Sequence, residues 1–383
     1  VSVMRILIVG GGAAGTIVAN KVARGLSDDV DRGVTEVVVL DKSNKHEYQP
    51  GYLFVALGEE EPEHFVRNEK DLLDEKVKFY SGAQGEVVSI NTKENKVKTA
   101  DGKEWTYDIL VISTGSVPDP SPIPGLKDAA YFFYTMEDAV KLRDALNSFK
   151  GGNIVISVTS LPYKCPVAQY EILFALHDRF KKSGINANFT YLFPINGTHQ
   201  HPVVSKVGES WMNEKGISIM SSFVIDSIDS KNRVIKSKDG RTVNYDLFIA
   251  IPPHRPSEVI IKSGLGNPWI PTDPFTLKSK QFKNIYVLGD TTDIPNVAKA
   301  GSVAEYEAAV VAKNVIADVK KTNNYYKYDG SAYCFIMHSM DKAGYLYMNY
   351  FTPPLVSLPS KYAKWVKLIY NELYWSMSEK AEL

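Results

Sequence analysis

The glycine-rich turn "GGGAAG" at residues 10–15 constrains the fold of this chain more than any other feature. It follows a short apolar strand at residues 6–9 and opens an alanine-rich helical pattern, "AAGTIVANKVARGL". In such a unit Gly10 makes the tight turn, Gly12 lets a pyrophosphate approach the backbone, and Gly15 lets the helix pack on the strand, with Ala14 between them. The helix N-terminus supplies unpaired N–H groups to the phosphates. The motif therefore predicts a dinucleotide-binding domain.

A second strand pattern, "TEVVVLD", ends in Asp41 and is followed by Lys42. A carboxylate at this place can accept hydrogen bonds from both ribose hydroxyls. The spacing from the glycine turn exceeds the usual ~20 residues, and we attribute the excess to a surface insertion, "SDDVDRG". Asp41 and Lys42 are therefore predicted to bind the cofactor.

Two later segments indicate which dinucleotide is bound. A strand pattern at residues 109–112 runs into Thr114-Gly115, and "KNIYVLGD" runs into Gly289-Asp290 and an alanine-rich helix. With these motifs in this order, the chain resembles the flavoprotein disulfide reductase superfamily, whose members have two dinucleotide domains. In that superfamily the aspartate matching Asp290 holds the ribityl chain, and the next helix points its N-terminus at the flavin. The resemblance implies FAD in the first domain.

A second Rossmann-like unit is predicted in the middle of the chain. Its elements are a strand at residues 153–158, a helix pattern "AQYEILFALHDRFKKSG" and a strand "ANFTYLF". The turn between the first two, "TSLPYKCPV", has no glycine, and Pro162 and Pro166 offer no N–H to a phosphate. The second strand runs into Pro194 without an acidic residue. We expect this unit to keep the fold without binding a nicotinamide nucleotide.

The chain has two cysteines, Cys165 in this turn and Cys334 far downstream. Two cysteines in a chain of this kind are often buried, inert thiols. Cys165, however, directly precedes a helix pattern, and a helix N-terminus is expected to lower the pKa of its thiol. Glu171, one to two turns into that helix, is a candidate proton handler for a sulfur substrate.

Four segments around these residues resemble the sulfide:quinone oxidoreductases and the flavoprotein of flavocytochrome c sulfide dehydrogenase. They are "PYKCPVAQYE", "YDG" before the second cysteine with "AGYLYMNYF" after it, "YDLFIAIPPHRP" and "DIPNVAKAGSVAE", and the resemblance covers nearly the whole chain. It implies that hydrosulfide attacks a disulfide or sulfur-bridged pair of Cys165 and Cys334. The persulfide would form on Cys165, and Cys334 would lie next to the flavin. Electrons would pass through FAD to a quinone.

The same resemblance assigns three further positions. Lys299 would place a positive charge near the pyrimidine edge of the flavin, although a solvated helix lysine is an open alternative. His254 would lie near the flavin and could assist quinone protonation. Some members tether the flavin through a third cysteine, but Tyr134 falls near that place here, so a covalent flavin through that residue is excluded.

A membrane-docking segment is predicted at the C-terminus, "KYAKWVKLIYNELYWSMSEK". Trp and Tyr favour the membrane interface and basic flanks favour anionic lipid, which predicts peripheral association on an unspecified face. A helix packed on the protein or forming a dimer contact stays open as an alternative. The apolar positions at helical spacing are Tyr362, Trp365, Val366, Ile369 and Leu373, with Lys361, Lys364 and Lys367 nearby.

The predicted architecture is an interleaved α/β protein. An FAD domain takes residues 1–117 and 284–324, a second Rossmann-like domain residues 118–283, and a C-terminal segment residues 325–383. The net charge of zero argues against nucleic acid. The two histidines of "THQHP" lack partners at metal-binding spacing, so no metal is predicted. Homo-oligomerisation is compatible with the sequence.

Three functions are open at this stage. The favoured one is a sulfide:quinone oxidoreductase. The second is another flavin dehydrogenase, either the cytochrome c-linked sulfide dehydrogenase or a type II NADH:quinone reductase. The lack of a visible secretory signal argues against the cytochrome c-linked enzyme. The missing second glycine turn argues against the NADH-dependent enzyme. The third is a flavin-binding relative without turnover.

Overall fold

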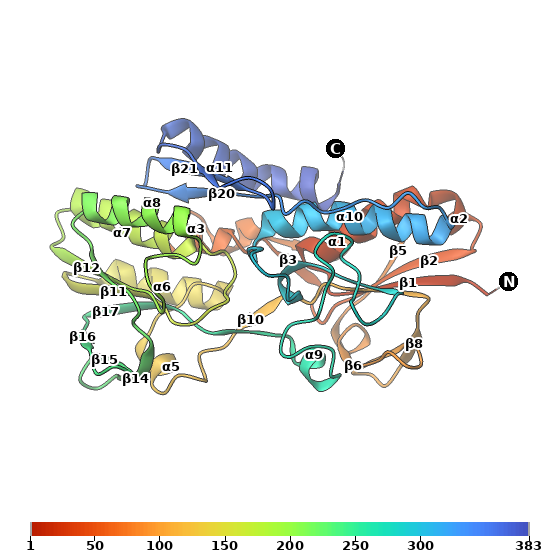
Figure 1. Cartoon of the computed structure of the whole chain (residues 1–383), viewed down its shortest axis with the longest axis horizontal. Coiled ribbons are helices and arrows are strands. Elements are labelled where there is room, and N and C mark those ends of the chain that lie inside the picture. The colour runs from red at the N-terminus through yellow and green to blue at the C-terminus, as the bar shows by residue number, and fades with distance from the viewer. Residues whose placement is uncertain (1, 382–383) are drawn as a thin grey trace.

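The computed structural model describes residues 2–381, which form two parallel sheets side by side with the C-terminal segment lying across both (Figure 1). The first sheet has the order β19-β9-β1-β2-β5, and every neighbouring pair is parallel. The strands are β1 (Met4–Val9), β2 (Thr35–Leu40), β5 (Val77–Tyr80), β9 (Ile109–Ile112) and β19 (Ile285–Val287). This is the predicted FAD domain, with its last strand supplied from far along the chain.

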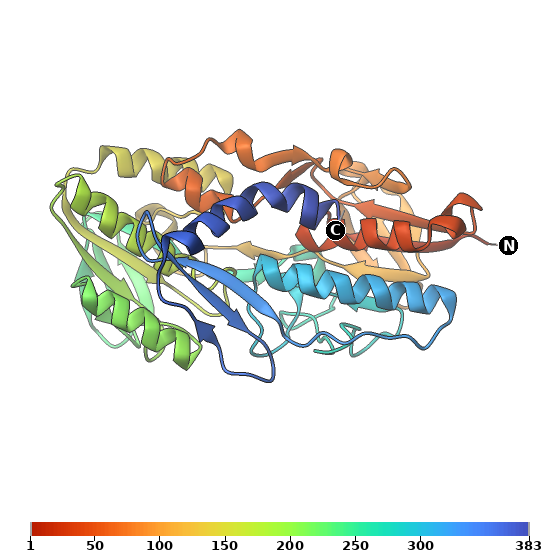
Figure 2. The ribbon, with the colours of Figure 1, turned by 90° about the horizontal axis from the view of Figure 1, so that it is seen from above.

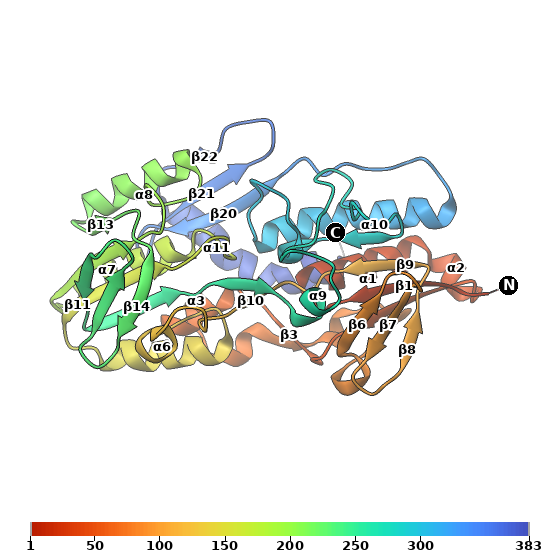
Figure 3. The same ribbon diagram turned by 60° about the horizontal axis from the view of Figure 1, so that its bottom comes forward.

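Both faces of the first sheet are covered, which explains the continuous apolar runs at residues 6–9, 37–40 and 109–112 of its strands. In β1, Ile6 and Ile8 belong to the core formed with helices α1 (Ala13–Gly25) and α10 (Gly301–Lys320). Leu7 and Val9 belong to the opposite core, formed with a small antiparallel sheet. Figure 3 shows that sheet below the strands; it consists of β6 (Val87–Asn91), β7 (Lys96–Thr99) and β8 (Glu104–Thr106).

The second sheet repeats this layering. Its parallel order is β13-β12-β11-β17. Ile154 and Ile156 of β11 pack with the helices on one face, while Val155 packs with an antiparallel sheet on the other. The elements are β11 (Gly152–Val158), β12 (Ala187–Leu192), β13 (Ser218–Met220) and β17 (Leu247–Ile251), with helices α6 (Met136–Ser148), α7 (Ala168–Lys182) and α8 (Pro202–Glu214), and strands β14 (Ile225–Asp229), β15 (Val234–Ser237) and β16 (Thr242–Asn244).

The chain crosses between the sheets on an antiparallel ribbon of β10 (Ser116–Pro118) and β18 (His254–Pro256). After this ribbon, Ile260 of α9 (Glu258–Lys262), Leu265 and Ile270 are buried in the core of the first sheet. The return to the first domain therefore begins near residue 257, ahead of the predicted residue 284. The segment between is irregular and rich in proline and glycine, so its sequence carries no strand or helix period.

The C-terminal segment forms β20 (Ala332–Met337), β21 (Ala343–Met348), β22 (Leu355–Val356) and helix α11 (Lys361–Leu373), which continues as a π-helical turn, η4 (Tyr374–Glu379). Seen from above, α11 lies over the junction of the two sheets (Figure 2). Shorter elements complete the described chain: α2 (Ser27–Asp31), β3 (Lys45–Glu47), α3 (Gly51–Ala56), β4 (Val66–Asn68), α4 (Glu69–Leu72), α5 (Leu126–Ala129) and 3₁₀ turns at Pro62–Phe65, Gly82–Gln84 and Gly289–Thr291.

Helix α11 has its apolar side outward, contrary to an ordinary surface helix. Tyr362 is 77% exposed and Trp365 66%, and Val366, Leu368, Ile369 and Leu373 are exposed with them. Lys364 and Lys367, predicted as basic flanks toward lipid, instead turn inward against the protein, since Lys364 is buried and Lys367 reaches a buried carboxylate. Between residues 2 and 381, no helix combines the length and apolarity needed to cross a membrane.

The end of the chain is held by a buried polar cluster. The two ring nitrogens of His46 lie 2.7 Å from a Glu69 carboxylate oxygen and 2.7 Å from the Tyr374 hydroxyl. The Glu379 carboxylate is 3.5 Å from the same ring and fully buried. Asn20 of α1 donates to the Glu379 carbonyl oxygen at 2.7 Å. These contacts fasten η4 to the first domain.

Candidate functional site

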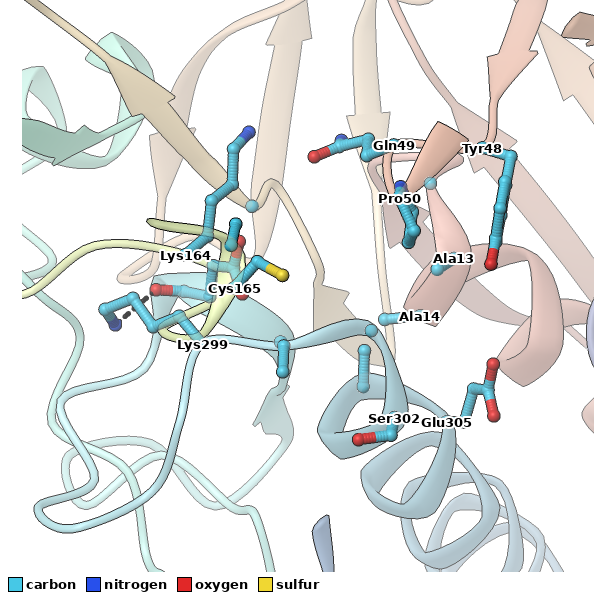
Figure 4. Close-up of a pocket in the computed structure, with 18 of the residues that line it drawn as sticks. Ala13, Ala14, Tyr48, Gln49, Pro50, Lys164, Cys165, Lys299, Ser302 and Glu305 are labelled. Atoms are coloured by element: carbon cyan, nitrogen blue, oxygen red, sulfur yellow. Dashed lines mark hydrogen bonds between the residues drawn. The ribbon is translucent and has the colours of Figure 1, made fainter. Parts of the chain in front are cut away.

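A cavity of about 380 Å³ lies at the carboxyl ends of the first sheet's strands, where the two domains and the C-terminal segment meet. Segments that are far apart in the sequence line it: the glycine turn, the turn after β9, the cysteine loop before α7, the start of α10, β20 and α11. Figure 4 shows part of this wall, with Cys165 facing Pro50 and Ala13 across the open space. The carboxyl ends of parallel strands are the usual place for a nucleotide site in an open α/β sheet.

The glycine turn has the geometry that a dinucleotide requires. Gly10 has φ +101°, and a Cβ there would lie 2.3 Å from the Ser113 carbonyl oxygen. A Cβ on Gly15 would lie 1.8 Å from the Gly10 carbonyl oxygen, which shows the close helix–strand packing that the sequence predicted. A Cβ on Gly12 would meet no atom within 4 Å, because this residue faces the cavity. The backbone at Gly12 is thus open to a ligand.

Two helix N-termini face this cavity. The N-cap residue of α1 is Gly12 and that of α10 is Ala300; both line the cavity, and neither helix has a side-chain cap within the described residues. Their first N–H groups carry partial positive charge, so together they suit the phosphates and the electron-rich ring edge of an anionic cofactor. Thr114 also lines the cavity, and its buried hydroxyl has no partner among residues 2–381.

Two carboxylates complete the cofactor side of the cavity. Asp41 accepts hydrogen bonds from the backbone N–H of Gly11 at 2.7 Å and Ser43 at 2.8 Å, which fixes it at the cavity wall. Asp290 accepts the Ser116 hydroxyl at 3.0 Å. Ala14, Gly115 and Gly289 line the same wall. The donors, the carboxylates and the open glycine fit FAD, with Asp41 toward a ribose and Asp290 toward the ribityl chain.

Lys42 does not belong to this wall. Its side chain is exposed and lies outside the cavity lining. Because successive side chains of an extended segment point to opposite sides, placing Asp41 at the cavity turns its neighbour to solvent. Lys42 is thus not brought together with the other predicted cofactor residues, and its part in cofactor binding stays a prediction.

Both cysteines reach the cavity. Cys165 sits in a left-handed turn (φ 51°), its N–H donates to the Lys299 carbonyl oxygen at 2.6 Å, and its sulfur points into the cavity (Figure 4). Cys334 lines the same cavity from β20. Both are free thiols in this structure. A residue before α7 and one on β20 are thus brought together by tertiary packing, as the sequence predicted.

The thiols are not activated in the way that the sequence suggested. Burial raises the pKa of the Cys165 thiol to about 12, Glu171 raises it further, and Lys367 acts in the opposite direction. Burial likewise raises the pKa of Cys334, with the same two residues acting in the same directions. Helix α7 begins at Ala168, three residues after Cys165, so loss of hydration outweighs the helix terminus.

Glu171 is buried beside the thiols, and its carboxylate is already engaged. One oxygen accepts the Met337 backbone N–H at 3.0 Å, and the Lys367 ammonium lies 3.0 and 3.2 Å from the two oxygens. Lys367, which the sequence assigned to a membrane surface, therefore belongs to the sulfur side of the cavity. Nothing in the local sequence around Lys367 indicates this contact.

Lys299 lines the cavity, but its ammonium is directed at the backbone. It donates to the Asp290 carbonyl oxygen at 2.6 Å and the Thr292 carbonyl oxygen at 2.9 Å, and it lies 3.9 Å from the ring centre of Trp269. Lys164, which the sequence reasoning missed, is a second buried cation in this wall; its ammonium makes a long hydrogen bond of 3.4 Å to the Ser116 carbonyl oxygen. Burial lowers the pKa of both lysines.

His254 lies behind the cavity wall rather than in it. Its ring packs edge-on against Tyr134 with 5.3 Å between ring centres, and Nδ1 is 2.9 Å from the Pro252 carbonyl oxygen. Burial lowers the pKa of His254 to about 3, so the ring is neutral at physiological pH. The predicted part in quinone protonation is not supported by this placement.

A third carboxylate was also missed. Glu305 lines the cavity from the first turns of α10 and accepts hydrogen bonds from the Tyr370 and Tyr333 hydroxyls. Burial raises the pKa of Glu305. In the sequence it stands inside an alanine-rich helix pattern, "SVAEYEAAV", where a glutamate is unremarkable. Within residues 2–381 there is no cluster of three or more metal-ligating side chains.

The turn of the second Rossmann unit is filled by its own side chains. Tyr163 is buried, and its hydroxyl donates to the Pro166 carbonyl oxygen at 3.2 Å. The Gln169 amide donates to the same hydroxyl at 2.6 Å. Packed side chains therefore fill this turn, where a nucleotide-binding unit would leave space for phosphates.

Comparison with known proteins places the chain among flavoprotein oxidoreductases. Residues 4–159 match the pyridine nucleotide-disulphide oxidoreductase family. The mitochondrial sulfide:quinone oxidoreductase of Dictyostelium discoideum is 30% identical over 355 residues, covering 89% of this chain and 76% of the relative. That of Mus musculus is 25% identical, covering 97% of this chain and 85% of the relative. The structure of the sulfide:quinone oxidoreductase from Aquifex aeolicus superposes with a TM-score of 0.86 at 20% identity, over 98% of this chain and 91% of that one.

Proposed function

This chain belongs to the sulfide:quinone oxidoreductase family, and from that premise we propose that it oxidises sulfide and passes the electrons through FAD to a membrane quinone. One observation carries the proposal: Cys165 and Cys334 line the same cavity as the glycine turn, Asp41 and Asp290. A pair of thiols beside a flavin site is the arrangement that two-electron sulfur chemistry needs.

The cysteines perform the sulfur steps. In the oxidised enzyme they form a disulfide, and hydrosulfide attacks the Cys165 sulfur, breaks the S–S bond and leaves a Cys165 persulfide with a Cys334 thiolate. A second hydrosulfide takes the outer sulfur away as hydrogen disulfide and leaves Cys165 as a thiol. The two thiols then re-form the disulfide and give up two electrons. In sum, two hydrosulfide ions, one quinone and one proton yield one hydrogen disulfide ion and one quinol.

When bound, FAD supplies the two-electron link between thiols and quinone. This chain's part is to hold that cofactor through Gly12, Asp41 and Asp290, and to bring Cys165 and Cys334 to one side of the cavity. Tyr163, packed into the second domain's turn, supports a donor other than a nicotinamide nucleotide.

A quinone resides in a bilayer, so the protein needs a surface that reaches it. The outward face of α11 supplies a candidate, because aromatic and aliphatic side chains are exposed along it, and Phe351, Leu355 and Leu358 in the preceding segment are exposed as well. Trp and Tyr with aliphatic neighbours favour the membrane interface. We therefore include peripheral membrane docking through α11 and residues 351–358 in the proposed function.

Serine substitutions at the two cysteines test this proposal. FAD-loaded Cys165→Ser and Cys334→Ser proteins are mixed with sulfide in the absence of oxygen, and flavin absorbance is followed. Both should lose sulfide-driven bleaching while dithionite still reduces their flavin, which shows that the cofactor site is intact. Unchanged bleaching by sulfide in either variant would contradict the disulfide mechanism.

A further inference from the structure

The inner face of α11 reaches directly into the sulfur side of the cavity. Lys367 extends from that face, with 12% of its side chain exposed, to Glu171, with 4% exposed. The ammonium lies 3.0 and 3.2 Å from the two carboxylate oxygens and also donates to the Phe335 carbonyl oxygen at 3.3 Å. The two side chains therefore form a largely buried ion pair, and its cation belongs to α11.

The pair joins the segments that carry the two cysteines. Glu171 stands on α7, six residues after Cys165. Its carboxylate accepts the Met337 N–H at 3.0 Å, and Met337 belongs to β20, three residues after Cys334. Lys367 completes the connection through Phe335, the neighbour of Cys334. Movement of either cysteine-bearing segment would thus disturb the same pair.

The charges of the pair act on both thiols in opposite senses. Glu171 raises the pKa of Cys165 and of Cys334, and Lys367 lowers both. A buried pair whose one member is removed leaves the other charge uncompensated in a medium that screens it poorly. The thiol pair therefore experiences a near-neutral environment only while both partners are present.

From these contacts we infer that Lys367 and Glu171 are positioning residues for the sulfur chemistry. Their ion pair sets the charge beside Cys165 and Cys334, and Glu171 does not serve as a proton acceptor. The chemical consequence rests on the proposed function, but the charge balance can be measured on the thiols without sulfide. Further charged groups face this region from the neighbouring elements. They are Lys164 in the cysteine loop, Asp290 and Lys299 from the first domain, Glu305 from α10, and the pair of Lys364 and Glu59 beside α11. They are unchanged in the variants below.

Single and double substitutions give effects of opposite sign. Lys367→Met leaves Glu171 uncompensated and should disfavour the thiolates. Glu171→Gln leaves the Lys367 charge uncompensated and should favour them. The double variant Glu171→Gln/Lys367→Met removes both charges and should return close to the wild type. The sign of each change reports the charge that remains beside the thiols.

The measurement is the rate of iodoacetamide alkylation of the reduced, FAD-loaded protein at one fixed pH near neutrality, with each cysteine identified by peptide mass. Because only the thiolate reacts, this rate should fall about tenfold in Lys367→Met and rise about tenfold in Glu171→Gln, which corresponds to a change of about one pH unit in the thiol pKa. Lys361→Met is the matched control, since Lys361 is an exposed lysine of the same helix and should leave both alkylation rates unchanged.

Rate changes of the same sign in the two single variants, or no change, would overturn the inference. If Lys367→Met does not fold, Lys367→Arg, which keeps the charge, should have wild-type alkylation rates, and Glu171→Gln alone still tests the sign. This outcome can be separated from the proposed function. Opposite changes in alkylation rate, in a protein whose flavin sulfide does not reduce, would support the role of the ion pair and contradict sulfide oxidation. Reduction by sulfide without such rate changes would support sulfide oxidation and contradict the role of the ion pair.

Discussion

Replacing Trp365 by alanine should weaken binding of this protein to phospholipid vesicles about tenfold. The side chain is 66% exposed on the outward face of α11. Full burial of a large apolar side chain is worth about 2 kcal/mol, so transferring two thirds of it into the interface contributes about 1.3 kcal/mol. An energy of this size corresponds to a factor of about ten in a binding constant. The stability of the protein in solution should hardly change, because little of the side chain contacts the protein.

The assay is co-sedimentation with vesicles of mixed zwitterionic and anionic lipid, paired with a thermal unfolding curve for each variant. Ile261→Ala is the matched control: Ile261 is 47% exposed, and it lies on α9, on the opposite side of the molecule from α11 (Figure 1). Its vesicle binding should equal that of the wild type. Equal binding of Trp365→Ala and wild type would refute the docking face. A large fall in unfolding temperature on the same substitution would instead identify α11's outer face as part of a protein interface.

Three further predictions concern the glycine turn, the buried Glu307 and the cluster around His46. Gly15→Ala should prevent folding, because its Cβ would lie 1.8 Å from the Gly10 carbonyl oxygen. Gly12→Ala should fold with unchanged stability in the absence of FAD, because its Cβ would meet no protein atom within 4 Å. It should nevertheless lose affinity for FAD, which is measured by flavin retention on gel filtration. Burial raises the pKa of Glu307 from 4.5 to about 8, so its contribution to stability is full below pH 4.5 and is lost as pH rises toward 8. Glu307→Gln should remove that loss, on the order of 5 kcal/mol, in urea unfolding compared at low and high pH. His46→Ala should cost about 3 kcal/mol in the same assay, because it leaves the buried Glu69 carboxylate and the buried Tyr374 hydroxyl without the ring that joins them. An unchanged free energy of unfolding would show that the cluster is not needed.

The local elements of this fold were predictable because each has a clear period. The predicted strand at residues 109–112 is β9 as observed, and the "AQYEILFALHDRFKKSG" pattern became α7 over residues 168–182. The role of the glycine turn was predictable because its backbone geometry depends on glycines at fixed positions in the local sequence. The irregular segment before β19 was assigned to the second domain, because its packing against the first sheet is tertiary and leaves no periodic signal in the sequence.

The site was predictable only as far as motifs reach. Cys165 and Cys334 were found because motifs surround them, but the pKa of Cys165 was predicted in the wrong direction, since hydration of a side chain is set by residues distant in sequence. The aromatic and aliphatic residues around Lys367 predicted a membrane surface, whereas its position on the inner face of α11 directs its side chain to Glu171. Helical spacing shows which residues share a face, and it does not show which face is inside.

We expect electrons to enter this protein through the thiols and not through the second Rossmann unit. The most direct test is stopped-flow absorbance of the oxygen-free, FAD-loaded wild-type protein, mixed separately with sulfide and with NADH. Sulfide should bleach the flavin rapidly, and NADH should leave the flavin spectrum unchanged. Bleaching by NADH alone would contradict entry through the thiols and would make the protein a nicotinamide-dependent quinone reductase.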